Sequence, residues 1–341
     1  MKRLICGILL VSLLLSGCAG QAEPQKTKYT ASFLTLFDTV TSIVGFAESE
    51  EAFKTITQPI HDNLLEYHQL FDIYNDYEGI NNLKTVNENA GIAPVTVDRK
   101  IIDLLLDCKS YYESTGGKVN VAMGSVLKLW HVARNDGIND PANAYLPKQE
   151  ALENAAQYMN FDCVVIDEAA STVFIADPDV SLDVGAVAKG WSVQQVCSKA
   201  PAGLLISVGG NVFATGPKDE NGAPWVVGVQ NPNGGDNYLH TLAITGGSVV
   251  TSGDYQRAYV VDGELYHHII DPVTLYPSTL WRSVTIVCAD SGLADALSTA
   301  LFLLPLEEGN ALLENLGAEA MWVNRDGEIF YSSGFEKMIR T

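Results

Sequence analysis

Basic side chains are scarce in this sequence of 341 residues. Only 21 Lys and Arg residues stand against 41 Asp and Glu residues, which gives a formal net charge of −20. Proteins that bind nucleic acid neutralise its phosphates with clusters of Lys and Arg, and the sequence contains no such cluster. The same acidity argues against a polybasic contact with a membrane surface. The composition therefore predicts that nucleic acid is not a partner.

The cysteine pattern argues against two further classes of site. There is no Cys-x-x-Cys pair and no His at metal-ligand spacing, so neither a zinc ribbon nor a thioredoxin-like redox motif is supported. Beyond residue 30 the cysteines lie in apolar contexts, which favours buried free thiols, although an exported protein can also form disulfides. They are Cys108, Cys163, Cys197 and Cys288.

Apolar runs long enough to span a membrane are also missing. The run at residues 4–15 has about a dozen residues, whereas a spanning helix needs about 20. It follows Lys2 and Arg3 and precedes a Ser-Gly pair, which is the order of a secretory signal peptide. The quartet at 15–18, Leu-Ser-Gly-Cys, resembles the lipobox at which a lipoprotein is cleaved and acylated. We therefore expect lipid on Cys18; an ordinary secreted chain with a chance Cys is the alternative.

These features predict three segments. Residues 1–17 form the signal peptide, residues 18–31 a lipidated flexible tether, and residues 32–341 a single folded domain. The sequence has no internal repeat, low-complexity block or long linker after residue 30. We expect the chain at the cell membrane, lipid-anchored on the extracytoplasmic face.

The pattern of apolar residues predicts a mixture of helices and short strands. Helical spacing predicts helices over 60–74, 148–159, 293–304 and 307–316, and another that Asp98 caps and that continues to residue 112. Alternation predicts strands over 33–46, 204–208, 225–230, 239–245, 248–252, 258–261, 264–270, 283–288, 320–324 and 328–332. Because there is no repeating strand-helix-strand rhythm, the expected class is α+β, with a mixed, largely antiparallel sheet and flanking helices.

The stretch 181–190, SLDVGAVAKG, is a candidate anion site. An extended piece ends at Asp183, Gly185 and Ala186 make a small-residue turn, and Lys189 falls in the first turn of a helix. Small residues let backbone N–H groups approach an anion, and the helix N-terminus adds favourable partial charge. This is not a Walker A loop, because no Ser or Thr directly follows the Lys. A tight turn with a solvated Lys is equally consistent.

Two oxygen-bearing side chains interrupt the apolar helix at 293–304. Asp295 and Thr299 are four residues apart, so they lie on one face of the helix. A carboxylate and a hydroxyl form an oxygen site suited to Mg²⁺, with phosphates and waters as further ligands. Alternatively, Asp295 interacts with the helix dipole and Thr299 bonds back to a carbonyl.

Adjacent histidines lie in the strand predicted at 264–270. Because successive side chains of a strand point to opposite faces, at most one of His267 and His268 faces a common site. A neutral His is a natural general base near neutral pH, although lone histidines are more often structural.

Taken together, these pieces resemble the ApbE family of FAD:protein FMN transferases. The similarity covers nearly all of residues 32–335, and weaker early matches lie at 37–39, 71–75 and 115–130. The main matching pieces, in the family's order and spacing, are 183–190, ISVGG at 206–210, TSGDYQR at 251–257, YHHIIDP at 266–272 and LADALSTALF at 293–302.

The resemblance implies a single domain of the ApbE type, which is T-fold-like, and a role for each matched residue. His268 would be the catalytic base and Lys189 would assist catalysis. The implied metal ligands are Asp295, Thr299 and the backbone carbonyl of Ala186. The implied contacts to FAD are Phe37, Tyr74, Lys118, Val119, Asn120, Asp183, Lys189 and Ile269.

The implied reaction moves FMN from FAD to a Thr or Ser hydroxyl of a target extracytoplasmic redox protein, with Mg²⁺ as cofactor. It forms a phosphoester and releases AMP. A Mg²⁺-dependent FAD pyrophosphatase and a non-catalytic flavin-binding lipoprotein are the alternatives. A flavinylated electron carrier would need an acceptor segment resembling Asp-x-x-Thr-Gly-Ala-Thr, which the sequence lacks.

The chain departs from the family pattern at several positions. Phe37 and Asp38 replace the usual Met-Gly, Asn120 replaces an Asp, Gln194 replaces an acid, and residues 275–277 differ from the usual Thr-Gly-x-Pro. We expect these changes to affect the flavin and adenosine contacts more than the metal ligands.

The lipid anchor predicts a modified N-terminus. Mass spectrometry of the mature protein should find Cys18 as its first residue and should find that residue acylated. An unmodified or internal Cys18 would contradict the lipoprotein interpretation.

Overall fold

A large antiparallel sheet is the frame of the molecule. The computed structural model describes residues 26–340 except 236 and 315, so the predicted signal peptide and Cys18 lie outside the described residues. In the described part, eight strands lie in the order β1-β2-β6-β7-β10-β13-β14-β15, and every neighbouring pair is antiparallel. They are β1 Thr27–Phe33, β2 Thr41–Ala47, β6 Leu205–Val208, β7 Asn211–Ala214, β10 Gly247–Gly253, β13 Trp281–Cys288, β14 Ala318–Asn324 and β15 Ile329–Tyr331.

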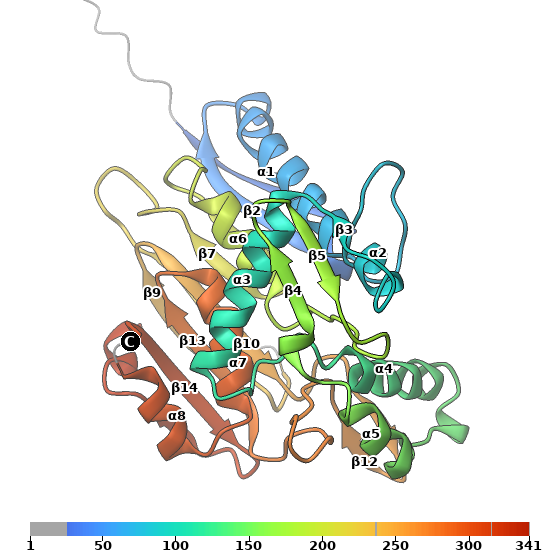
Figure 1. Cartoon of the computed structure of the whole chain (residues 1–341). Helices are drawn as coiled ribbons and strands as arrows, with labels where there is room; N and C mark the ends of the chain where they lie inside the picture. Colours follow the sequence, from blue (N-terminus) through green and yellow to red (C-terminus); the bar gives the residue numbers. More distant parts are fainter. Residues whose placement is uncertain (1–25, 236, 315, 341) are drawn as a thin grey trace, which may run out of the picture.

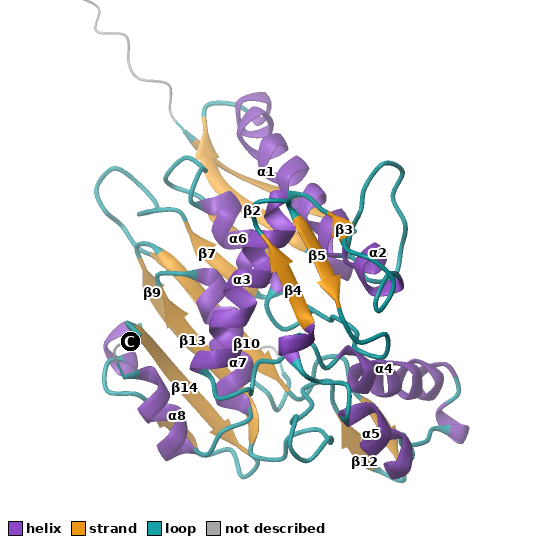
Figure 2. Cartoon of the chain, in the orientation of Figure 1, coloured by secondary structure: helices purple, strands orange, loops and turns teal. Residues whose placement is uncertain are grey.

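Helices α1 (Glu50–Phe71), α6 (Ala188–Cys197) and α7 (Ser291–Phe302) pack on one face of this sheet. Figure 2 shows α6 and α7 lying over the strands. Helix α7 is buried on nearly all sides, because Ala, Leu and Phe fill most of its positions. It begins after Asp290, whose carboxylate accepts the N–H of Leu293 and so caps the helix. The opposite face of the sheet is covered by the hairpin of β8 (Trp225–Gln230) and β9 (Tyr238–Ile244).

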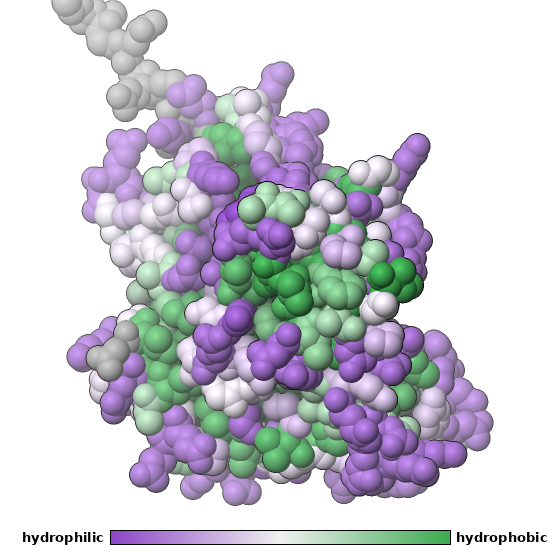
Figure 3. All heavy atoms as spheres, in the orientation of Figure 1, coloured by the Kyte–Doolittle hydropathy of each residue, from purple (hydrophilic) through white to green (hydrophobic). Residues whose placement is uncertain are grey.

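Smaller elements surround this frame. A three-stranded sheet consists of β3 (Val95–Thr96), β5 (Thr172–Ile175) and β4 (Val164–Asp167), and apolar atoms gather over β4 and β5 in the middle of the face shown in Figure 3. A separate apolar cluster joins α4 and α5 to the β11–β12 pair (Figure 1). The remaining elements are α2 Leu83–Glu88, α3 Arg99–Ser114, α4 Gly124–Asn139, α5 Gln149–Ala156, α8 Leu306–Leu313, β11 Tyr259–Val261, β12 Glu264–Tyr266 and the 3-10 turns Leu36–Asp38, Pro141–Asn143, Phe161–Cys163 and Phe335–Met338.

The α+β class and the largely antiparallel sheet are confirmed, but the N-terminal boundaries are wrong. Of the strand predicted at 33–46, only residues 41–46 form a strand, as part of β2; residue 33 ends β1, and between them lies a turn in which Phe37 and Asp38 have φ of 52° and 53°. Left-handed backbone of this kind cannot continue a strand. Because β1 begins at Thr27, residues 27–31 belong to the folded domain and not to the predicted tether.

Two further predictions need correction, and one long helix was missed. Helix α1 begins at Glu50 and not at 60, because Ser49 accepts the N–H of Ala52 and the helix continues through Pro59. Helix α4 was not predicted; glycines at both of its ends weaken the helical signal, and a Cβ at Gly124 would overlap the carbonyl oxygen of Ser181. The strand predicted at 264–270 ends at Tyr266.

The four cysteines beyond residue 30 are free thiols. Cys108, Cys197 and Cys288 are buried as expected, while Cys163 is only half-buried. Burial raises the pKa of the Cys197 thiol to about 12, so that thiol stays protonated at neutral pH. Within residues 26–340, setting aside the two gaps, no helix combines the length and the apolar character that a membrane span requires.

Phe302 offers a direct test of the core beneath α7. Its fully buried ring packs with Trp281, Ile286 and Leu301. We expect Phe302→Ala to lower the free energy of unfolding, measured in urea, by about 3–5 kcal/mol. The control Val226→Ala, at a side chain 42% exposed on β8, should change it by no more than about 0.5 kcal/mol. Equal effects of the two substitutions would contradict this assignment of the core.

Candidate active site

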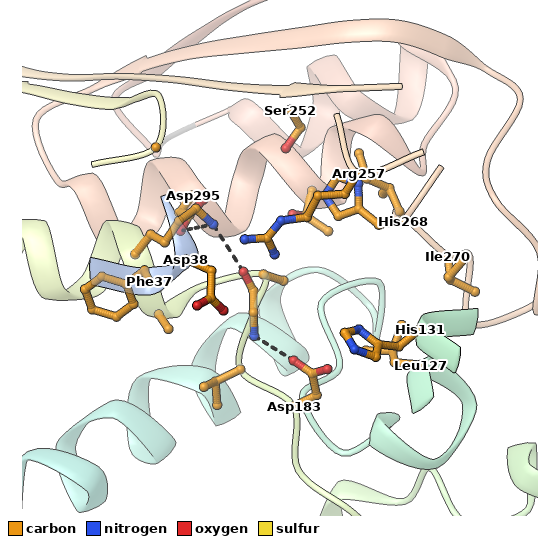
Figure 4. A pocket seen from close by; sticks show the side chains of 18 of the residues that line it. Phe37, Asp38, Leu127, His131, Asp183, Ser252, Arg257, His268, Ile270 and Asp295 are labelled. Atoms are coloured by element: carbon orange, nitrogen blue, oxygen red, sulfur yellow. Dashed lines mark hydrogen bonds and ion pairs between the residues drawn. The ribbon is translucent and has the colours of Figure 1, made fainter. Parts of the chain in front are cut away.

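One cavity of about 250 Å³ collects every predicted site residue of the described chain. Its lining includes residues of α4, of the first turn of α6 and of α7, and Figure 4 shows Leu127, His131, Asp183 and Asp295 around it. The predicted residues that line it are Phe37, Tyr74, Lys118, Val119, Asn120, Asp183, Ala186, Lys189, His268, Ile269, Asp295 and Thr299. Cys18, the predicted lipidation site, lies outside the described residues. The sequence therefore identified residues that the fold brings together from six separate segments.

Helices α6 and α7 cap each other at this cavity. Helix α6 has no capping side chain of its own, and the N–H of Gly190 in its first turn donates to Oδ2 of Asp295 on α7, at 2.8 Å. In return, Oε1 of Gln194 on α6 accepts the N–H of Ser291 at the start of α7, at 2.8 Å. A carboxylate at a helix N-terminus is favoured by the helix dipole. Gln194, which replaces an acid of the family pattern, thus still serves as an acceptor.

Gly190 permits this close approach. A Cβ at this position would overlap the carbonyl oxygen of Ser291 and the side chain of Asp295. Only glycine therefore lets the first turn of α6 reach the carboxylate.

The loop before α6 follows the sequence prediction. Asp183 donates its N–H to Val121 and accepts the N–H of Gly185 at Oδ1, which fixes the turn. Lys189 lies in the first helical turn, as expected, and its Nζ is 3.3 Å from the carbonyl oxygen of Gly185 and 3.8 Å from Oδ2 of Asp295. Lys189 and Asp295 therefore place opposite charges at one end of the cavity.

The candidate metal ligands offer only hard oxygen donors. The Asp295 side chain is 6% exposed, and its Oδ1 accepts no hydrogen bond from any described residue. Thr299 and Ala186 line the same cavity. No cluster of three or more His, Cys, Asp and Glu side chains suited to a metal occurs among residues 26–340, the gaps aside. A cation here would therefore need a hydroxyl, a backbone carbonyl, water or ligand oxygens besides this carboxylate, a donor set that suits Mg²⁺.

The two histidines have different environments. His267 is buried; its Nε2 lies 2.8 Å from the carbonyl oxygen of Ser278 and its Nδ1 accepts the N–H of Ile269, so both ring nitrogens are used. His268 lines the cavity, and its Nδ1 lies 3.0 Å from the carbonyl oxygen of Gln256. That contact assigns the proton to Nδ1 and leaves Nε2 with a free lone pair. The prediction that only one of the pair faces the site is confirmed, although neither belongs to a strand.

Burial, followed by the nearby cations Arg257 and Lys189, lowers the pKa of His268 to about 3. Without an anion in the cavity this imidazole is neutral at physiological pH. A neutral ring with a free Nε2 can accept a proton.

An aromatic pair forms another wall. Asp72 accepts the backbone N–H groups of Tyr74 and Asn75 and so fixes the loop after α1. Tyr74 then stacks on His131 of α4, with ring centroids 5.2 Å apart and planes inclined by 24°. This exposed stack offers a flat surface to a ring system.

Lys118 closes the cavity from another side. Its Nζ lies 3.2 Å from Oδ1 of Asp271, so this ion pair connects the turn at residues 116–118 to the loop that follows His268. Asn120 uses its amide locally, because Oδ1 accepts the N–H of Ala122 and Nδ2 donates to Met159. The replacement of an Asp at this position thus leaves an amide that fixes the turn.

The sequence model of the ApbE family matches residues 37–322 of this chain. The chain belongs to the ApbE family. Two relatives, both called FAD:protein FMN transferase, are 36% identical (Treponema pallidum; 76% of this chain and 75% of the relative) and 33% identical (Klebsiella pneumoniae; 80% and 86%). An ApbE protein of Thermotoga maritima superposes with a TM-score of 0.81 at 29% identity, over 92% of this chain and 100% of that one. A flavin transferase ApbE of Vibrio cholerae shares the fold, with a TM-score of 0.74 at 22% identity over the same shares.

Several lining residues of this ApbE chain escaped the sequence analysis. Leu127, His131 and Arg134 of α4 line the cavity, as do Arg257 and Asn211 from elsewhere, and Figure 4 shows Leu127, His131 and Arg257. The spacing of the α4 residues, at i, i+4 and i+7, is a helical signal that could have revealed them. Nothing local marks Asn211, because its position depends on the sheet.

The lowered pKa of His268 predicts a pH effect on the stability of this ApbE chain. In the unfolded chain the imidazole of His268 binds a proton near pH 6.5, whereas in the folded chain its pKa is about 3. Because the unfolded chain therefore binds more protons between these two pH values, the fold loses stability as the pH falls from 6.5 toward 3. Urea unfolding should show that, between pH 7.5 and pH 5.0, the free energy of unfolding falls more for the unsubstituted protein than for the His268→Gln variant. The difference is at most about 1.4 kcal/mol per pH unit. Parallel losses would contradict the assignment.

Proposed function

We infer that this chain is an FAD:protein FMN transferase, which moves FMN from FAD to a Thr or Ser hydroxyl of a target protein and releases AMP. One observation carries the conclusion: in a chain of the ApbE family, Asp183, Lys189, His268, Asp295 and Thr299 line a single cavity. Relatives at 36% and 33% identity bear the same activity in their names. The reaction forms a phosphoester bond to the acceptor oxygen and breaks the pyrophosphate bond of FAD.

Cations of the cavity suit an anionic donor. Lys189 lies at the N-terminal end of α6, where the helix dipole also favours an anion. Arg134 and Arg257 line the cavity and form no ion pair with any residue that the structure describes. A pyrophosphate held among these groups would raise the pKa of His268, since that pKa is depressed in part by the same uncompensated cations.

His268 is the group suited to accept the proton of the incoming hydroxyl. Its Nδ1–H is held by the Gln256 carbonyl, which orients the ring and leaves Nε2 for the substrate. Phosphoryl transfer depends mainly on positioning and charge stabilisation, so a fixed base beside Lys189 matches its needs. The stack of Tyr74 on His131 is suited to hold a ring of FAD.

The donor set around Asp295 is consistent with Mg²⁺. Asp295, Thr299 and the backbone carbonyl of Ala186 would hold the ion, and Oδ1 of Asp295 is not committed to any described donor. When bound, Mg²⁺ offsets negative charge on the pyrophosphate.

The N-terminal sequence extends the proposal to a location. Acylation of Cys18 would anchor the domain on the extracytoplasmic face of the cell membrane, where FAD and the acceptor must also be present. The acceptor is then a membrane-associated redox protein. The lipobox-like quartet at 15–18 supports this part of the proposal.

The activity is tested by incubating the purified chain with FAD, Mg²⁺ and an acceptor peptide. Flavin fluorescence in a denaturing gel reports transfer, and AMP release reports cleavage of FAD. Labelled acceptor supports transferase activity, AMP without label would instead show a pyrophosphatase, and neither would show a flavin-binding protein.

Asp295 should be essential for both outputs. Asp295→Asn keeps the shape and an acceptor for the Gly190 N–H but removes the charge, so we expect label and AMP release to fall at least about a hundredfold. Asp295→Ala should abolish both. The matched control is Asp290→Asn on the same helix, which retains the cap on Leu293 and should stay active. AMP release at the native rate from Asp295→Asn would refute the metal assignment.

A further inference from the structure

Asn211 carries a buried amide nitrogen that has no hydrogen-bond partner among the described residues. It is the first residue of β7, its side chain is 2% exposed, and its Nδ2 donates to no described residue. It also lines the candidate active site. A buried amide donor that is unpaired destabilises a fold, and the position of Asn211 at the cavity wall would let a ligand supply the partner.

The hairpin before β7 fixes the position of this amide. Val208 pairs with Asn211 across a two-residue turn, and both turn residues have positive φ, 57° at Gly209 and 93° at Gly210. Such a turn is the tight type that joins adjacent antiparallel strands. A Cβ at Gly209 would lie 2.7 Å from Cγ2 of Thr39, so the turn is also packed against the loop before β2.

The register of the sheet directs Asn211 toward α6 and α7. Residues two apart on a strand share a face, and Phe213 packs in the core cluster that contains Trp191 of α6 and Ala296 of α7. Asn211 therefore lies on the sheet face that carries these helices. That is the end of the cavity where Lys189 and Asp295 place their charges.

We propose that Asn211 donates a hydrogen bond from Nδ2 to a phosphate oxygen of the FAD pyrophosphate, and so serves as a substrate-binding residue. The inference rests on the proposed function, because it takes FAD as the ligand. A donor is what a phosphate requires, and the neighbouring Lys189 supplies the charge that a neutral amide lacks. The amide then positions the phosphate between the sheet and the N-terminus of α6.

The test compares two nearly isosteric substitutions. Asn211→Leu removes the amide, and Thr41→Val is its matched control. Thr41 is fully buried, its Oγ1 also lacks a described partner, and it lies on β2, where it pairs with Val208 of β6 outside the cavity lining. Binding of FAD, FMN, AMP and riboflavin is measured by calorimetry, and thermal unfolding gives Tm.

We expect Asn211→Leu to bind FAD about tenfold more weakly or worse, because a hydrogen bond to a charged group is lost. The binding of either FMN or AMP should weaken similarly, according to which phosphate the amide contacts. Riboflavin should bind with the same affinity as it does to the unsubstituted protein. Tm should stay the same or rise, since no internal hydrogen bond is broken. Thr41→Val should leave all four affinities unchanged.

Other results would overturn the inference. Unchanged FAD affinity, an equal loss for riboflavin, or a lower Tm in Asn211→Leu would show that the amide does not serve phosphate. The substitution Asn211→Asp distinguishes a contact to phosphate from a contact to a cation. It should weaken the binding of FAD; tighter FAD binding in the presence of Mg²⁺ would instead show that the side chain contacts the cation. A native chain that binds FAD but labels no acceptor would refute the proposed function and leave this inference standing.

Discussion

The site depends on the contact in which helices α6 and α7 cap each other. Asp295 accepts the Gly190 N–H, and Gln194 accepts the Ser291 N–H, so each helix completes the N-terminus of the other. Because both helices pack on the sheet, this contact fixes Lys189 and Asp295 relative to β7 and β10. The same carboxylate thus has a structural and a proposed chemical role, which explains why the charged end of the cavity is built on rigid helices and not on loops.

Residue patterns alone predicted the loop before α6, the polar pair on α7 and the pair of histidines, whereas the flavin contacts such as Tyr74 and Lys118 were implied by the resemblance to the ApbE family. The turn at Gly185 and the helix that begins near Lys189 are visible in residue types alone, and so is the polar pair on α7. His131 and Arg134 were missed together with α4, whose start is set by the close approach of Gly124 to Ser181, a tertiary contact. In the same way, the turn at Phe37 breaks an alternating pattern that favours one long strand. Residue types along the chain predicted these polar groups, whereas long-range packing determines where the helices and strands begin and end.

Charge is distributed unevenly in this acidic chain. Many of its basic residues are neutralised at the surface, as Arg99 is by Asp103 and Glu168 and as Lys84 is by Asp76 and Glu88. In the cavity, Arg134 and Arg257 form no ion pair with described residues. A low-dielectric pocket concentrates the field of such groups, while the negative exterior repels anions elsewhere. Net charge therefore says little about the ligand of the site.

The early start of β1 sets a limit on where the domain can work. Eight residues separate Cys18 from Thr27, and a fully extended chain advances at most about 3.6 Å per residue. The segment between the proposed lipid and the sheet can therefore span at most about 30 Å. If Cys18 is acylated as proposed, the enzyme would meet a membrane-bound acceptor by diffusion in two dimensions. The high effective concentration at a shared membrane surface would then reduce the affinity, and so the binding surface, that such an acceptor requires.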